Sequence, residues 1–446
     1  MTNRCTRMGL VLAMTAMLGL SGCDNDDNDD NSGPADTAGA PLDLTILHIN
    51  DHHSHIPAED FDLDVTTLGL SAVDEGGAPI GEVEVSYGGY PRMVTLFESI
   101  VSEGGNVLKL HAGDAITGTL FYSLFEGTAD ATMMNQICFD AFALGNHEFD
   151  DGDTALAAFL DSLNSGACET PTLAANVVPG PASALADGYL EPYTIVVRDG
   201  QEIGIIGIDI AQKTKVSSSP DPDTEFLDET TTTQDNIDEL TELGVDKIIL
   251  LTHYGYENDL ALAAAVSGVD VIVGGDSHSL LGDETFTELG FNPVGEYPTQ
   301  VTDADGNPVC VVQAWEYTHL MGRLDVSFDE NGVITSCSGS PIMPIGEEYV
   351  YEFSDAEDRS LDLADADLVT QSLTANPELL VVEEDASTLA LIEGFEAEIA
   401  VLEQTVIGTV AADLCLERYP GQGRSNLCDV SATYAQGSDI SNIVAK

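Results

Sequence analysis

The sequence predicts a layered α/β fold. Six short runs are almost continuously apolar and rich in β-branched residues, as expected for strands that are covered on both faces. Stretches with apolar residues at spacings of three and four alternate with these runs, which favours helices between the strands. The predicted strands are residues 44–49, 107–110, 141–144, 203–208, 247–251 and 269–273. The predicted helices include residues 154–163, 233–243 and 258–266.

The pattern changes after Gly274. Residues 309–317 and 324–328 are typical of β-strands, with a turn at residues 329–332, so we expect a sheet edge or a second sheet there. Residues 346–409 read as an acidic connecting segment that leads into a helix. The apolar face of this helix consists of Leu389, Ile392, Phe395, Ile399 and Leu402, and Gly408 lies near its end.

The length and the charge of the chain narrow the classes of function. A chain of 446 residues with 43% hydrophobic residues exceeds what one core usually supports. Its 78 acidic and 13 basic residues give a formal net charge of −65, which repels nucleic acid and anionic lipid. A solvated acidic surface suited to saline surroundings is the simplest interpretation, and a specific cation-storage role is the alternative. An anionic substrate would need bound cations that reverse the local field.

The first 23 residues predict export. Arg4 and Arg7 precede an apolar run over residues 8–20 that is too short to cross a membrane as a mature helix. The run ends at Leu20-Ser21-Gly22-Cys23, which resembles the lipobox of bacterial lipoproteins, and residues 24–40 read as an acidic linker. We expect a periplasmic or membrane-anchored lipoprotein whose only membrane contact is a lipid on Cys23. An ordinary signal peptide with an incidental Cys23 is the alternative.

Six further cysteines suggest disulfides, because an even number in an exported chain is typical of a disulfide framework. Six cysteines permit 15 pairings. The simplest hypothesis joins near neighbours: Cys138 with Cys168, Cys310 with Cys337, and Cys415 with Cys428.

Five short polar motifs each follow a predicted strand directly, which is where α/β proteins assemble their sites. They are Asp51-His52-His53, Gly113-Asp114, Gly145-Asn146-His147-Glu148, Thr252-His253 and Gly275-Asp276-Ser277-His278. Carboxylates, imidazoles and an amide form a mixed oxygen and nitrogen shell, which suits two divalent ions such as Zn, Mn, Mg, Fe or Co. With Asp114 as the bridge, two ions about 3.5–4 Å apart would position a hydroxide for in-line attack on phosphorus.

The residue sequences of these motifs resemble those of the calcineurin-like metallophosphoesterases, in particular the secreted 5′-nucleotidase branch. Residues 48–53, 113–119 and 145–150 carry the resemblance, and residues 275–278 look most like the periplasmic NAD nucleotidases. The resemblance implies a four-layer α/β/β/α sandwich with two metal ions.

Individual roles follow from the same resemblance. One ion would be held by Asp51, His53, Asp114 and His278. The other would be held by Asp114, Asn146, His253 and Asp276. His147, oriented by Asp150, would stabilise the transition state or protonate the leaving group.

The resemblance also implies a domain plan. Many members place histidine where this chain has Asp276, so the carboxylate could favour Mn or Mg over Zn. Members also carry a large C-terminal nucleotide-binding domain, of which this chain would hold only the opening. The predicted parts are a signal peptide (1–23), an acidic linker (24–40), the metallophosphoesterase domain (41–345), a connecting segment and helix (346–409) and the start of the C-terminal domain (410–446).

The remaining histidines, Trp315 and Arg92 are not expected to be metal ligands. His48, His52, His55 and His111 are expected to support the ligands or face solvent, because alternate side chains of a strand point to opposite faces. His319 and Trp315 are expected to pack in the core. Arg92 is expected either to pair with an acidic side chain near the site or to lie on a helix surface.

The leading hypothesis is an exported two-metal phosphoesterase that hydrolyses nucleotide phosphate or pyrophosphate bonds, with a nucleotide or NAD as substrate. No nucleic acid and no protein partner is predicted. One alternative keeps the scaffold and changes the substrate to a sulfur ester, as in the thiosulfate-processing hydrolases. The other is a truncated, non-catalytic surface lipoprotein with structural metals.

Overall fold

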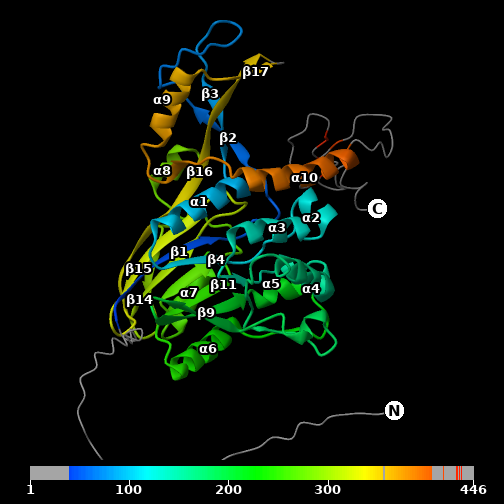
Figure 1. The fold of residues 1–446 in the computed structure, drawn as a ribbon, viewed down its shortest axis with the longest axis vertical. Coiled ribbons are helices and arrows are strands. Elements are labelled where there is room, and N and C mark those ends of the chain that lie inside the picture. The colour runs from blue at the N-terminus through cyan, green and yellow to red at the C-terminus, as the bar shows by residue number, and fades with distance from the viewer. Residues whose placement is uncertain are drawn as a thin grey trace, which may run out of the picture. The chain divides into compact units, whose positions relative to one another are not determined.

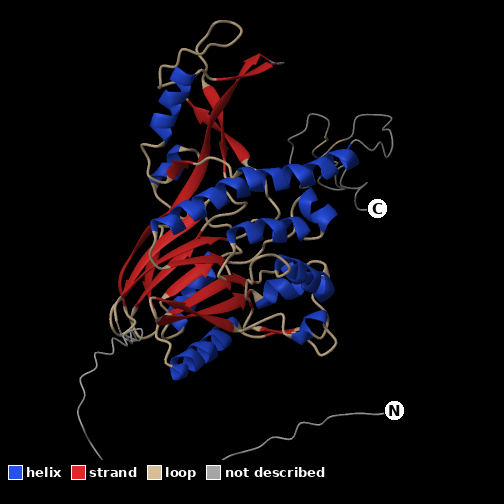
Figure 2. Cartoon of the chain, in the orientation of Figure 1, coloured by secondary structure: helices blue, strands red, loops and turns tan. Residues whose placement is uncertain are grey.

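The structure is a computed structural model that describes residues 40–354 and 357–403, together with residues 415, 428, 429, 431 and 433. The predicted signal peptide, Cys23 and most of the acidic linker lie outside the described residues, as do Gly408 and most of the segment that follows it. The described part is an α/β assembly in which helices flank two large sheets (Figure 2).

The first large sheet mixes parallel and antiparallel strands. Its order is β2-β3-β16-β15-β1-β4-β5-β6, and β17 and β18 also pair with β16. Strands β1, β4, β5 and β6 run parallel, whereas β15 and β16 are antiparallel neighbours. The strands are β1 (Leu42–Ile49), β2 (Glu59–Asp64), β3 (Glu82–Tyr87), β4 (Val107–His111), β5 (Ala141–Ala143), β6 (Thr172–Leu173), β15 (Met321–Phe328), β16 (Ile334–Ser354), β17 (Glu357–Ser360) and β18 (Leu379–Val381).

The second large sheet has the order β13-β14-β12-β11-β9-β8, and its four central strands are parallel. Its strands are β8 (Tyr193–Arg198), β9 (Gln201–Asp209), β11 (Ile248–His253), β12 (Val271–Gly274), β13 (Thr299–Thr302) and β14 (Pro308–Gln313). A separate small sheet pairs β7 (Val177–Val178) with β10 (Glu225–Phe226).

Helices cover the outer faces of both sheets, and Figure 1 shows α1 and α3 beside β1 and β4, with α6 near β9. The helices are α1 (Tyr90–Glu103), α2 (Leu120–Phe125), α3 (Thr128–Ile137), α4 (Gly152–Leu163), α5 (Ala211–Ser217), α6 (Glu229–Leu243), α7 (Tyr256–Ala265), α8 (Glu284–Glu288), α9 (Leu363–Leu373) and α10 (Ala386–Glu403). Two 3₁₀ turns, η1 (His147–Phe149) and η2 (Ala184–Asp187), complete the described elements.

Strand β1 shows why its run is apolar on both faces. Leu44 and Ile46 point into the core between the two sheets, and Leu47 and Ile49 point into the core under α1, α3 and α4. Because successive side chains of a strand alternate, a strand between two cores carries apolar residues on both faces. A third core lies between the second sheet and helices α6 and α7. The predicted four-layer α/β/β/α sandwich is therefore confirmed.

Beyond the sandwich, β16 continues as a long strand across residue 345, where the domain boundary was expected. We call β2, β3, β17, α9, β18 and residues 343–354 of β16 the extension. The extension has its own core, which includes Val85, Met343, Ile345, Tyr349 and Val369. The prediction of an acidic connecting segment over residues 346–409 missed the end of β16, β17, α9 and β18, because the end of β16 alternates buried and exposed residues only irregularly and all four residues of β17 are exposed.

The structure confirms the predicted turn at residues 329–332 and corrects the end of one predicted strand. The turn at residues 329–332 is confirmed, since Asp329 accepts from the Asn331 and Val333 N–H groups and Gly332 has φ 79°. The predicted strand over residues 309–317 is wrong beyond Gln313, because Trp315 and Tyr317 take positive φ values.

The predicted C-terminal helix is confirmed as α10, which packs against α1 and α2. Ile392 and Ile399 are buried in the core under the first sheet, and Phe395 lies edge-on to Phe125 of α2. Leu402 was expected on this buried face, but it is 52% exposed because it lies at the end of the helix, past the last buried contact.

The three near-neighbour disulfides are confirmed: Cys138–Cys168, Cys310–Cys337 and Cys415–Cys428. None of the helices in the described part of the chain has both the length and the apolar character needed to cross a membrane.

Candidate metal centre

The five polar motifs meet where the parallel strands of the two sheets end. The N–H of Asp51, after β1, donates to the carbonyl of Gly113, after β4, at 2.9 Å. The N–H of Asp276, after β12, donates to the Asp51 carboxylate at 3.0 Å. We call these loops, residues 50–54, 112–118, 144–150, 253–255 and 275–278, the site edge.

Five of the seven predicted metal ligands have left-handed backbone conformations. The φ values are 49° for Asp51, 47° for His53, 53° for Asp114, 74° for Asp276 and 47° for His278. A non-glycine residue in this region costs on the order of 1–3 kcal/mol, and such strain persists only where the surroundings enforce it. The strain at the site edge is concentrated in the residues that the motifs single out.

Two glycines let the loops of the two sheets approach each other. A Cβ atom on Gly145 would lie 2.3 Å from Oδ1 of Asp114. A Cβ atom on Gly113, which has φ 90°, would lie 2.7 Å from Nδ1 of His253. Both distances are impossible contacts, so any side chain at either position would push the predicted ligands apart.

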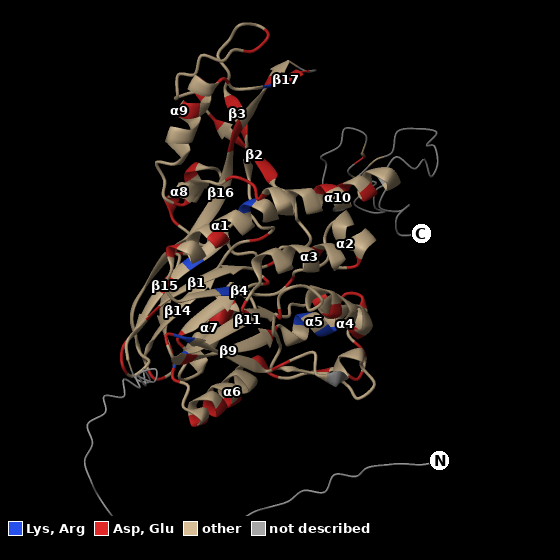
Figure 3. Cartoon of the chain, in the orientation of Figure 1, with Lys and Arg blue, Asp and Glu red and all other residues tan. Residues whose placement is uncertain are grey.

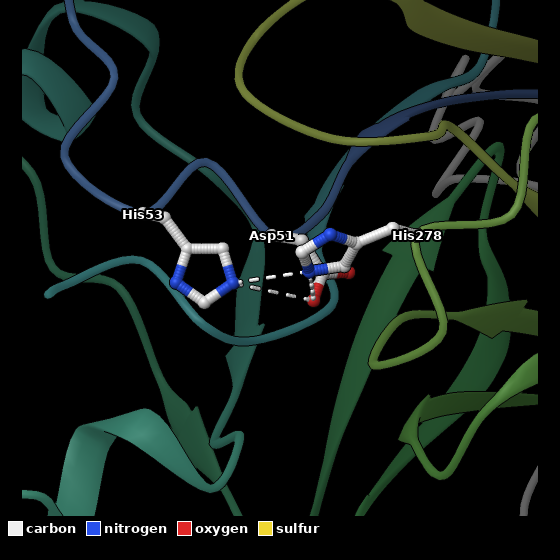
Figure 4. Close-up of side chains that lie close together, drawn as sticks. All are labelled: Asp51, His53 and His278. Carbon is white, nitrogen blue, oxygen red and sulfur yellow. Dashed lines mark hydrogen bonds and ion pairs between the residues drawn. The ribbon is translucent and has the colours of Figure 1, made fainter. Parts of the chain in front are cut away.

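The first group of potential ligands consists of Asp51, His53 and His278, whose ligand atoms lie within 4.8 Å of one another (Figure 4). Nε2 of His278 lies 3.2 Å from the Asp51 carboxylate and 3.2 Å from Nε2 of His53. Nε2 of His53 lies 3.8 Å from Asp51 Oδ1. Two imidazole nitrogens and a carboxylate aimed at one point form a donor set that a divalent cation accepts.

The second group consists of Asp51, Asp114 and His253. Nε2 of His253 lies 3.0 Å from the Asp114 carboxylate and 3.8 Å from Oδ1 of Asp51 and of Asp276. Its Nδ1 donates to the Ala112 carbonyl at 2.8 Å, which fixes the ring so that Nε2 is the nitrogen directed at the carboxylates and the one that a cation would bind in place of a proton. Asp276 belongs to none of the three compact groups found among the described residues, and its carboxylate pairs with Lys213.

The amide of Asn146 supplies an independent test of whether a cation fits. Its side chain is fully buried, and neither the amide oxygen nor the amide nitrogen has a hydrogen-bond partner. A buried polar group without a partner is costly, and native proteins almost always satisfy such groups. A cation held by the Asn146 oxygen would satisfy that oxygen, so the residues present fit a metal ion.

The charges at the site edge depend on one another. Burial disfavours the charged form of Asp114, yet the neighbouring His253 lowers the pKa of this carboxyl below its usual range. Burial likewise opposes the charge on His253, but Asp114 and Asp51 raise its pKa well above the usual value. The carboxylates thus favour the protonated form of the nearest histidine. Bound cations would neutralise the same carboxylates in its place.

His147 and Asp150 form the predicted pair on and after η1. Nδ1 of His147 donates to the Asp150 carboxylate at 2.6 Å, and this hydrogen bond raises the pKa of the imidazole. The backbone N–H of His147 donates to Asp114 Oδ1 at 2.9 Å. A ring nitrogen of His147 also groups with the ligand atoms of His53 and Asp114. The ring, 37% exposed, therefore lies beside the ligands at a position that a substrate can reach.

Glu148 has a structural role that the sequence did not reveal. Its buried carboxylate accepts the backbone N–H groups of Asp114, Ala115 and Gly145, at 3.0, 2.7 and 2.6 Å. Burial raises its pKa to about 7, and the Asp114 charge acts in the same direction. Glu148 thus joins the loops after β4 and β5. The sequence shows this glutamate in the Gly-Asn-His-Glu motif, but the spacing of the motif does not reveal which groups its side chain contacts.

Two further neighbours of the ligands were also missed. Lys213 of α5 pairs with Asp276, and Glu316 pairs with Nδ1 of His278. No motif marks either residue in the sequence. Tyr317 follows Glu316, and its ring packs against the rings of His53 and His278.

Three of the four neighbouring histidines lie inside the protein, where His48 bonds the Tyr297 hydroxyl and His111 accepts the N–H of Gly113. His48, His52 and His111 are fully buried, so the solvent-facing alternative is excluded for them. Nδ1 of His52 is hydrogen-bonded to Nε2 of His111 at 2.8 Å, and Nε2 of His52 lies 3.2 Å from Asp130. His55 is partly exposed and pairs with Glu59 at 2.8 Å.

The remaining expectations concern Arg92, His319 and Trp315. Arg92 is buried and pairs at 3.5 Å with Glu384, a residue beyond β18, so it neither faces the site nor lies on a helix surface. Arg92 is not where either expectation placed it, because the first turn of α1, which carries it, packs under the extension. His319 is buried and packs at 4.8 Å from the Trp315 ring, as expected.

Comparison with known proteins agrees with this geometry. The family model of the calcineurin-like phosphoesterases matches residues 44–280. A probable 5′-nucleotidase of Treponema pallidum is 41% identical over 84% of this chain and 60% of its own length. The NAD 5′-nucleotidase of Haemophilus influenzae is 33% identical over 92% of this chain and 65% of its own length.

A solved structure of the Haemophilus influenzae NAD nucleotidase superposes with a TM-score of 0.74, at 34% identity, over 84% of this chain and 63% of that one. The chain thus spans under two thirds of the length of these relatives. The matched region contains every strand that leads into the site edge. The chain belongs to the calcineurin-like phosphoesterase family.

Proposed function

We propose that this protein is a two-metal phosphoesterase that hydrolyses phosphate or pyrophosphate bonds of nucleotides, with a nucleotide or NAD as its substrate. The observation that carries the proposal is the convergence of the predicted ligands beside the paired His147 and Asp150. The relatives at 33% and 41% identity, named as a NAD 5′-nucleotidase and a probable 5′-nucleotidase, support the substrate class.

Two overlapping ligand sets are available for divalent cations. Asp51, His53, Asp114 and His278 would hold one, and Asp114, Asn146, His253 and Asp276 would hold the other, with Zn, Mn, Mg, Fe and Co as candidates. When bound, the two cations would neutralise phosphoryl oxygens and lower the pKa of a coordinated water.

The residues of the chain have separate tasks in this proposal. Asp150 fixes the orientation of the His147 ring through the 2.6 Å hydrogen bond and favours its protonated form. A protonated imidazole beside the phosphoryl group can donate to a developing charge or to the leaving oxygen. Glu148 holds the backbone of Asp114 and Gly145 so that both loops keep their positions.

The test uses the full chain, stripped of metal and reloaded with Mn²⁺ or Zn²⁺. The loaded protein should release phosphate from AMP, AMP from NAD, or nitrophenol from nitrophenyl phosphate. His147→Asn should keep its metal content while hydrolysis falls about 10²- to 10⁴-fold, the usual contribution of a general acid.

His55→Gln is the matched control, because His55 also pairs with a carboxylate but belongs to none of the compact groups among the described residues. It should retain activity. Absence of hydrolysis with every ion and substrate would sink the proposal and leave a non-catalytic metal protein. Turnover confined to sulfur esters would instead favour the alternative substrate class.

We further propose that the protein is exported and held by a lipid on Cys23. The N-terminal motif supports lipidation, and three disulfides support an oxidising compartment. Cys23→Ser should move the protein from the membrane fraction to the soluble periplasmic fraction of an expressing cell and abolish labelling by a fatty-acid probe. Unchanged labelling in the variant would refute the lipid anchor.

A further inference from the structure

Lys213 lies against the candidate metal centre, and neither the motifs nor the proposed function uses it. It is the third residue of α5, the short helix that follows β9. Its ammonium group pairs with Oδ1 of Asp276, the same oxygen that lies 3.8 Å from Nε2 of His253. One carboxylate oxygen therefore faces both a lysine and the predicted ligand cluster.

Basic side chains are rare in this protein, which makes this contact informative. The chain has 13 lysines and arginines against 78 acidic residues, and Figure 3 shows few basic positions among many acidic ones. Among the ion pairs of the described lysines and arginines, only that of Lys213 involves a predicted metal ligand. An ammonium group at the mouth of an acidic site is a candidate for binding an anion.

The helix is fixed while the end of the lysine is free to move. Thr214, the next residue, is buried and donates to the carboxylate of Asp209 at 2.7 Å, which anchors α5 to the end of β9. The Lys213 side chain is 39% exposed, and that of Asp276 is 12% exposed. A lysine has a flexible four-carbon stem and can exchange partners without moving its helix.

We propose that Lys213 is an exchangeable cation: it neutralises Asp276 in the metal-free protein, is displaced when a divalent cation binds Asp276, and then binds a phosphate oxygen of the substrate. This inference rests on the proposed function and adds a phosphate-binding residue to it. A divalent cation at Asp276 competes with the ammonium for the same oxygen and also repels it. The released ammonium would remain beside Asp276, where it could pair with an anion bound at the metals.

The exchange predicts two effects of opposite sign for Lys213→Met, which keeps the length of the side chain and removes its charge. Mn²⁺ should bind the metal-stripped variant about two- to fivefold more tightly than the wild type, because the competing cation is gone. Inorganic phosphate should bind the Mn²⁺-loaded variant about tenfold more weakly, because one charge-assisted hydrogen bond is lost. A lysine that only holds Asp276 in place would weaken Mn²⁺ binding instead.

Both effects can be measured by isothermal titration calorimetry, and neither requires turnover. Lys215→Met is the matched control, since Lys215 lies on the same helix and its ammonium donates to the Phe226 carbonyl at 3.4 Å instead of pairing with a predicted ligand. It should leave both affinities within about twofold of the wild type. In an Asp276→Asn background, Lys213→Met should no longer tighten Mn²⁺ binding to the same extent, because the shared carboxylate is absent.

The outcomes separate this inference from the proposed function. Tighter Mn²⁺ binding together with weaker phosphate binding supports the exchange even if no nucleotide is hydrolysed. Unchanged or weaker Mn²⁺ binding, or unchanged phosphate binding, overturns it even if the enzyme is active. Lys213→Arg provides a second variant: it retains the charge and should keep phosphate affinity within about threefold of the wild type, and a loss as large as that of Lys213→Met would also overturn the inference.

Discussion

The site edge and the extension belong to one chain but are stabilised in different ways. The extension is a conventional core of apolar side chains, and none of the described non-glycine residues in β2, β3, β16 and α9 has a positive φ. The site edge buries carboxylates, imidazoles and an unsatisfied amide, and five of its seven predicted ligands lie on left-handed backbone. Apolar burial elsewhere must offset this local cost.

This difference teaches which part of the protein a cation should affect. The apolar core of the extension has no group that a divalent ion could satisfy, whereas the site edge gathers acids and bases that depend on one another for their charge. We therefore expect metal binding to stabilise the site edge and to leave the extension unchanged. Four substitutions can break or sharpen this contrast.

The largest effect is expected for Asp114→Ala. Asp114 lies within reach of His53, His147 and His253, and it belongs to both proposed ligand sets. Removal of a residue that merely orients a ligand weakens metal binding about 10- to 100-fold, so loss of a shared ligand should exceed a hundredfold and abolish hydrolysis. Metal content after dialysis measures the effect, and retention of two equivalents of metal would contradict the role of Asp114.

The next largest effect is expected for Met343→Ala in the extension. Met343 is fully buried, and truncation of such a side chain costs about 2–5 kcal/mol of unfolding free energy. Denaturation by urea should show this loss, while the affinity of the folded protein for Mn²⁺ stays the same. A parallel loss of Mn²⁺ affinity would show that the two regions are coupled.

Glu148→Gln should have an intermediate effect that lowers both the free energy of unfolding and the affinity for metal. Glutamine has one acceptor oxygen for the four backbone N–H groups that Glu148 now satisfies, so at least one of them loses its partner at a cost of about 1–3 kcal/mol. Metal affinity should fall about 10- to 100-fold as the two loops loosen.

Glu229→Gln is the control for this change, since Glu229 accepts only one backbone N–H, from Ala211, and glutamine can keep that bond. Both affinity and stability should stay near the wild-type values in the control. Wild-type metal affinity in Glu148→Gln would show that the two loops need no such connection.

The smallest effect concerns pH and Asp209. Burial raises the pKa of this fully buried carboxyl to about 8, so the folded protein keeps a proton that the unfolded chain releases above about pH 4. The free energy of unfolding of the metal-free protein should therefore fall as pH rises from about 4 to 8, by up to about 1.4 kcal/mol per pH unit from this group.

Asp209→Asn should remove this contribution and flatten the slope between pH 5.5 and 8, measured by urea denaturation. Asp235→Asn, at an exposed position of α6, should leave the slope unchanged. An equal slope in wild type and Asp209→Asn would show that Asp209 does not bind a proton in the folded state.

The sequence predicted much of the sandwich because its strands are buried on both faces. Runs such as residues 44–49 and 203–208 are almost continuously apolar, and β1 and β9 contain them. The extension was missed because strands such as β2 alternate partly buried and exposed residues with many acidic side chains, which resembles a loop in composition. The predicted end of the strand near Trp315 was wrong because the backbone geometry next to the site overrides β propensity.

The sequence by itself determined the order of chemical groups: which strands end in a carboxylate, an imidazole or an amide, and which cysteines are near neighbours. Only the tertiary structure decided which of these groups meet, because convergence depends on the packing of two sheets whose loops can lie far apart in the chain, with 227 positions from Asp51 to His278. It also decided that Asp276 faces Lys213 and that Glu148 points to the backbone of Asp114. Contacts between elements distant in sequence leave no periodic signal, so no spacing could have predicted them.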